Sequence, residues 1–68
     1  MFIYTLYTLT GETLGQTPLL EQAIRTARAY AAARRVSCVV ECRRLDTDEA
    51  RRVLQNADGS MVKLWQAA

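Results

Sequence analysis

The stretch TPLLEQAIRTARAYAAARRVSCVVECR, residues 17–43, decides the fold because its apolar spacing changes halfway along. In its first part, apolar residues recur every three or four positions, as in a helix with one buried face. Thr17 suits the N-cap of this helix and Pro18 its first position, so we predict a helix over about residues 18–35. The predicted buried stripe is thin and rich in alanine: Leu20, Ala23, Ile24, Ala27, Tyr30 and Ala31.

The second part of the stretch, residues 36–43, alternates in the manner of a half-buried strand. We expect one face, with Val36, Cys38, Val40 and Cys42, to lie against the helix, and the other, with Ser37, Val39, Glu41 and Arg43, to face solvent. The two cysteines would be about 13 Å apart along a strand, too far for an internal disulfide. Reduced, buried cysteines are typical of a cytoplasmic protein.

Upstream of the helix, residues 2–9 predict a strand because they are rich in β-branched and aromatic side chains. Both faces of this strand are partly apolar, so we expect it near the centre of a sheet. The dipeptide TG that follows is a turn signal, and residues 12–16 predict a short return strand. A two-residue turn would place Tyr7 opposite Leu14.

Downstream of the second strand, the sequence favours a short helix at about residues 47–57. Asp46 followed by Glu49 resembles a capping box, and the apolar residues after them fit helical spacing. The acidic cluster of Asp46, Asp48 and Glu49 then lies at a helix N-terminus, where negative charge is favourable. We therefore assign these carboxylates to capping and predict no metal site.

The alternative for this segment is a strand at residues 51–55, joined by a tight turn at 56–59 to a last strand at 61–66. With the helix, the element order is β-β-α-β-α-β. We predict a single small α/β domain of the α+β type over residues 1–68. It has two layers, with a mainly antiparallel sheet of three or four strands and the long helix on one face.

The composition excludes several classes of function. Histidine is absent, so His-containing catalytic triads and His-bearing zinc sites are excluded. A chain of 68 residues leaves little core to hollow into a catalytic cavity. We expect a non-enzymatic cytoplasmic protein with no cofactor, no small-molecule substrate and no membrane segment, and the Ala/Arg-rich sequence suggests a bacterial source.

The first functional hypothesis is protein–protein interaction or self-association. One helix covers only one face of a sheet, and an uncovered face or an exposed edge strand can bind a protein partner or a second copy. The candidate residues of that interaction face are Tyr4, Tyr7, Val39 and Trp65.

The alternative hypothesis is nucleic-acid binding through an arginine-rich rim. Residues 25–44 carry a net charge of +5, from six arginines and one glutamate. Arginine pairs at the ends of elements could converge on one surface, with Tyr4 or Trp65 stacking on bases. The candidate phosphate contacts are Arg28, Arg34, Arg35, Arg43 and Arg44.

Overall fold

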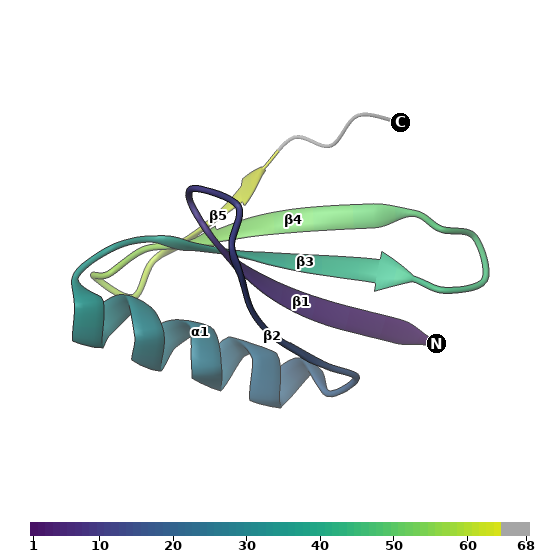
Figure 1. The fold of residues 1–68 in the computed structure, drawn as a ribbon, viewed down its shortest axis with the longest axis horizontal. Coiled ribbons are helices and arrows are strands. Elements are labelled where there is room, and N and C mark those ends of the chain that lie inside the picture. Colours follow the sequence, from purple (N-terminus) through teal and green to yellow (C-terminus); the bar gives the residue numbers. More distant parts are fainter. Residues whose placement is uncertain (65–68) are drawn as a thin grey trace.

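The computed structural model describes residues 1–64, which form one antiparallel sheet with a helix packed on one face (Figure 1). The order of strands across the sheet is β2-β1-β3-β4-β5. This confirms a small α+β domain with a mainly antiparallel sheet and one long helix. The elements are β1 (Phe2–Thr8), β2 (Thr13–Thr17), α1 (Leu20–Arg34), β3 (Cys38–Arg44), β4 (Ala50–Gln55) and β5 (Met61–Leu64).

The predicted second helix at residues 47–57 is wrong, because this segment forms β4 and pairs with β3. Val53 and Leu54 fit the apolar spacing of a helix, but in β4 they point to opposite faces of the sheet. Each has an apolar neighbour across the strand pair, since Val53 lies opposite Val40 and Leu54 opposite Val39. The alternative strand, with its turn to β5, is the observed structure. The sheet therefore has five strands, in the order β-β-α-β-β-β.

The acidic cluster does not cap a helix, as predicted, but lies in the turn between β3 and β4. Asp46 accepts a hydrogen bond of 2.8 Å from Arg44 Nε, and Asp48 accepts one of 2.8 Å from Arg43 Nη1. Asp48 also adopts a positive φ of 61°. Ion pairs with the end of β3 thus take the place of the predicted helix cap.

The start of α1 also differs from the prediction. The helix begins at Leu20, and its N-cap is Leu19, which makes no side-chain capping bond. Thr17 ends β2, and its Oγ1 accepts a hydrogen bond of 3.1 Å from the Leu19 amide and donates one of 3.0 Å to Gln22 Oε1. The predicted N-cap at Thr17 and first helical position at Pro18 are therefore two residues too early.

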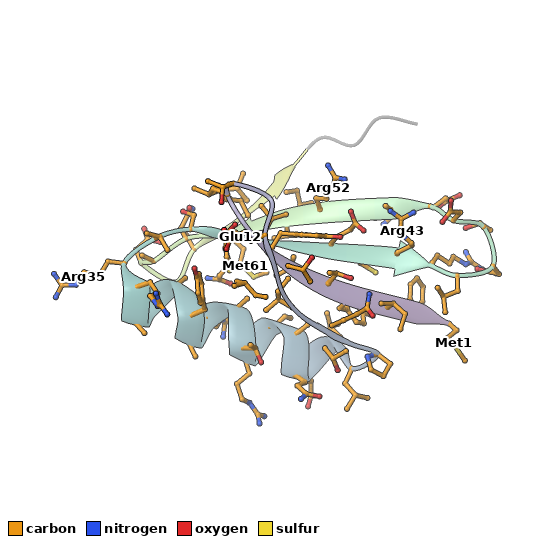
Figure 2. All side chains as sticks on the ribbon, viewed as in Figure 1. Met1, Glu12, Arg35, Arg43, Arg52 and Met61 are labelled. Carbon is orange, nitrogen blue, oxygen red and sulfur yellow. The ribbon has the colours of Figure 1, made fainter. Side chains whose placement is uncertain are left out.

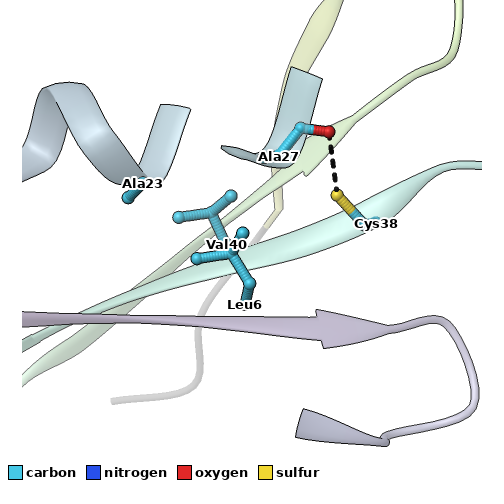
Figure 3. Packing of buried hydrophobic residues seen from close by; sticks show 5 residues of the cluster. All are labelled: Leu6, Ala23, Ala27, Cys38 and Val40. Carbon is cyan, nitrogen blue, oxygen red and sulfur yellow. Dashed lines mark hydrogen bonds between the residues drawn. The ribbon is translucent and has the colours of Figure 1, made fainter. Parts of the chain in front are cut away.

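The core lies between α1 and the centre of the sheet (Figure 3). On the helix it consists of Ala23, Ala27 and Ala31, which are fully buried, as the alanine spacing predicts. Half of the surface of Leu20 is exposed, so its assignment to the buried stripe is wrong. The side chains that β1 and β3 contribute to the core are Leu6, Cys38 and Val40.

Both cysteines are free, as predicted from their spacing along β3. Cys38 is fully buried, and its thiol donates a hydrogen bond of 3.6 Å to the carbonyl of Ala27. Burial raises the pKa of the Cys38 thiol, because the thiolate would lose its hydration in the core. This side chain therefore acts as a small apolar residue beneath the helix.

The hairpin of β1 and β2 contains a bulge that the sequence did not predict. Leu6 lies opposite Gly15 and Tyr7 opposite Thr13, so Leu14 is the additional residue and the predicted Tyr7–Leu14 pair is wrong. The turn is longer than two residues, because the Thr8 amide bonds the carbonyl of Glu12 at 2.8 Å. The longer turn and the bulge together shift the register.

Arg35 ends α1 in a strained conformation, and replacing it by glycine should stabilise the protein. Its φ of 54° and ψ of 40° lie in the left-handed region, where a helix usually ends in glycine. We expect Arg35→Gly to raise the free energy of unfolding by about 1 kcal/mol, measured by urea denaturation. Arg34→Gly, one residue earlier inside the helix, should lower it by about 1 kcal/mol. An Arg35→Gly protein less stable than the wild type would contradict this account.

Candidate functional site

The strand register assigns side chains to the two faces of the sheet, and the face without α1 carries an apolar row. Tyr7 lies opposite Val39, Val39 opposite Leu54, and Leu54 opposite Val62, so the row crosses β1, β3, β4 and β5. We call these four residues the apolar row. The first three are half-buried, whereas Val62 on β5 is 48% exposed. The row therefore becomes most accessible at the edge of the sheet.

A hollow of about 360 Å³ lies beside the apolar row, where the turn between β1 and β2 borders the helix-free face. Its walls combine apolar side chains with one arginine and the backbone of the turn. It is lined by Tyr7, Thr8, Leu9, Gly11, Val39 and Arg52. Tyr7 and Val39 line this hollow and also belong to the apolar row, so the two are continuous.

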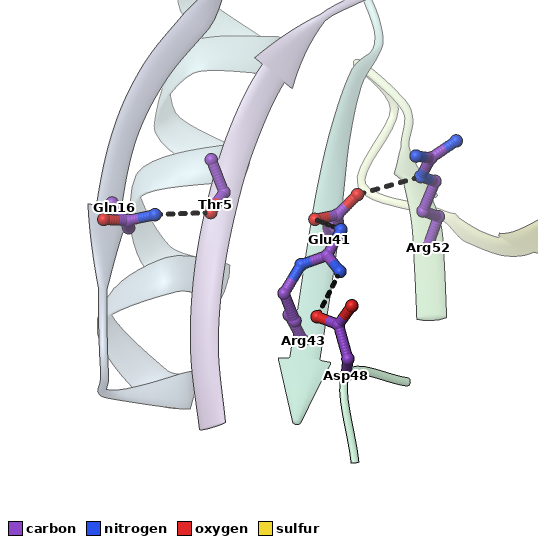
Figure 4. Close-up of polar contacts among 6 residues, drawn as sticks. All are labelled: Thr5, Gln16, Glu41, Arg43, Asp48 and Arg52. Carbon is purple, nitrogen blue, oxygen red and sulfur yellow. Dashed lines mark hydrogen bonds and ion pairs between the residues drawn. The ribbon is translucent and has the colours of Figure 1, made fainter. Parts of the chain in front are cut away.

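A polar row runs beside the apolar row and is held by direct contacts (Figure 4). Gln16 Nε2 donates a hydrogen bond of 3.1 Å to Thr5 Oγ1. Glu41 accepts bonds of 3.2 Å from Arg43 Nη2 and 3.1 Å from Arg52 Nε. Glu41 lies on the face away from the helix and is nevertheless only 3% exposed, and both of its ion-pair partners are arginines.

Two ion pairs hold the Arg43 side chain in place. The hydrogen bond to Asp48, followed by the charge of Glu41, raises the pKa of the Arg43 guanidinium above its ordinary value. Arg43 therefore joins the β3–β4 turn to the middle of the helix-free face. With two carboxylate partners, its charge is largely neutralised locally.

The predicted interaction residues do not all share one surface. Tyr7 and Val39 lie directly opposite each other on the helix-free face. Tyr4 lies on the other face, packed against the core and opposite Cys42. Burial, and then the neighbouring Cys42, raises the pKa of the Tyr4 hydroxyl. Trp65 lies outside the described residues.

Two members of the apolar row, Leu54 and Val62, escaped the sequence analysis. Leu54 was assigned to a helix, so its place beside Val39 could not be foreseen. The signal that could have revealed it is the alternative strand at residues 51–55, which puts Leu54 and Arg52 on one face.

The arginines predicted to bind phosphate do not converge on one rim. Arg35 and Arg43 lie toward opposite ends of the molecule (Figure 2), whose longest dimension is 34 Å. Arg43 is paired with two carboxylates, and Arg44 Nε binds Asp46 at 2.8 Å. By contrast, the ion pairs found within residues 1–64 include no arginine of α1. The predicted set therefore divides into a neutralised group on β3 and a group on the helix with no carboxylate partner among these ion pairs.

The rest of the described chain adds few candidate sites. Within residues 1–64, no three His, Cys, Asp or Glu side chains are placed to hold a metal ion. No helix of that part of the chain has the length and apolar character needed to cross a membrane. Comparison with protein-family models, curated proteins and solved structures finds no match.

Proposed function

We propose that this chain is a non-enzymatic interaction module that associates with a second copy of itself through β5 and the adjoining helix-free face. The observation that carries the proposal is the apolar row, which crosses the sheet and ends at the exposed Val62 on an edge strand. The carboxylates of the β3–β4 region also support a non-catalytic role. Glu41, Asp46 and Asp48 are held by arginines, and a carboxylate so engaged is a poor general acid or base.

The core of a single chain is small, which favours a fold that a partner helps to stabilise. The buried apolar side chains are a leucine, a valine, a cysteine and three alanines, which is little for a five-stranded sheet. Large apolar side chains are instead left accessible at both ends of the sheet and at the start of the helix. They include Met1, Phe2, Leu9, Leu19, Leu20, Leu45, Met61 and Val62.

The two edge strands differ in their capacity to pair with another strand. β2 is interrupted by the bulge at Leu14, and Pro18 follows its last residue. Bulges and prolines are common devices that protect a sheet edge. β5 pairs with β4 in continuous register from Met61 to Leu64, with no bulge or proline. β5 is therefore the edge better suited to accept a strand of a second copy.

Antiparallel pairing of β5 with its own copy has a favoured register. If Val62 lies opposite Val62 of the second copy, Lys63 lies opposite Met61 rather than opposite another Lys63. This register avoids like charges across the pair and keeps both apolar rows on one face of a continuous sheet. The residue exposed at the end of each row then becomes the centre of the contact.

Sedimentation velocity over a wide range of protein concentrations tests the proposal. We expect the wild-type chain to form dimers as concentration rises. Val62→Lys should weaken the association about ten-fold or more, because it places two charges at the centre of the contact. Leu14→Lys introduces the same side chain on the bulged edge and should leave association unchanged. A wild-type chain that stays monomeric at every concentration would refute self-association, and equal effects of the two variants would refute the assignment to β5.

A further inference from the structure

We draw no further inference here: the strongest candidate, the hollow of about 190 Å³ where β3 ends and β4 begins, lined by Phe2, Cys42, Arg44, Glu49 and Arg51, carries nothing because its thiol is a lone cysteine and nothing in the structure shows what ligand or partner would occupy it.

Discussion

Replacing Leu6 by alanine should leave much of the protein unfolded at physiological temperature. Leu6 is 2% exposed and is the largest apolar side chain in the core, where it packs beneath Ala23 and Ala27 of α1. Truncating a buried leucine costs about 2–5 kcal/mol, because the transfer energy is lost and a cavity remains. A domain of this length has a total stability of about 3–10 kcal/mol, so the loss is a large part of the whole.

Urea denaturation followed by circular dichroism measures this effect. The matched control is Leu45→Ala, in the turn between β3 and β4, where half of the leucine surface is exposed. The control should change the free energy of unfolding by less than about 0.5 kcal/mol. If Leu6→Ala and Leu45→Ala lose similar stability, the small core between α1 and the sheet does not hold the fold together.

The sequence predicted best the elements whose apolar pattern fits only one type of secondary structure. Alanines recur every four residues along α1, at positions 23, 27 and 31, and all three are buried. The alternation predicted over residues 36–43 is confirmed from Cys38 onward, because Cys38 and Val40 of β3 face the helix, whereas Val36 lies before the strand and is 43% exposed. In both cases local spacing and tertiary burial point to the same structure.

The sequence of residues 47–57 fits either a short helix or a strand. Its local pattern favours the helix, but the structure contains the strand β4. The acids before it and the spacing of Val53 and Leu54 fit a helix start, but β3 had a free edge that a strand could complete. Arg43 forms an ion pair with Asp48, and Arg44 forms one with Asp46. Long-range pairing decided this segment, and a local pattern does not contain that information.

The composition of the helix-free face also depends on long-range strand pairing, which the local sequence pattern does not contain. Sequence alone left open which of Tyr4 and Tyr7 faced away from the helix, because both faces of β1 are partly apolar. The burial of Leu6 beneath the helix settles this, since it places Tyr4 on the core side and Tyr7 opposite Val39. Likewise, the convergence of the arginines was a question of strand direction, and α1 and β3 end at opposite ends of the molecule.

Pairing of β5 through Val62 would keep the same face of each sheet on the same side, so both copies of α1 would lie on one side of the continuous sheet.

Removing Arg43 and Arg52 together should destabilise the protein far more than removing the carboxylate they bind. Glu41 is 3% exposed, whereas the side chains of Arg43 and Arg52 are 38% and 57% exposed. When Glu41→Gln removes the negative charge, both guanidinium groups can turn to water, and we expect a loss of about 1–2 kcal/mol in hydrogen bonding. When Arg43→Gln/Arg52→Gln removes the positive charges, a buried carboxylate is left unpaired, which costs about 3–5 kcal/mol.

Urea denaturation of the two variants and of their combination measures this asymmetry. In the triple variant no buried charge remains at this site, so adding Glu41→Gln to the double arginine variant should restore part of the lost stability. That recovery is the decisive readout, because independent contributions would make the triple variant the least stable of the three. A triple variant less stable than the double variant would mean that the arginines stabilise the helix-free face through their packing and not through the charge of Glu41.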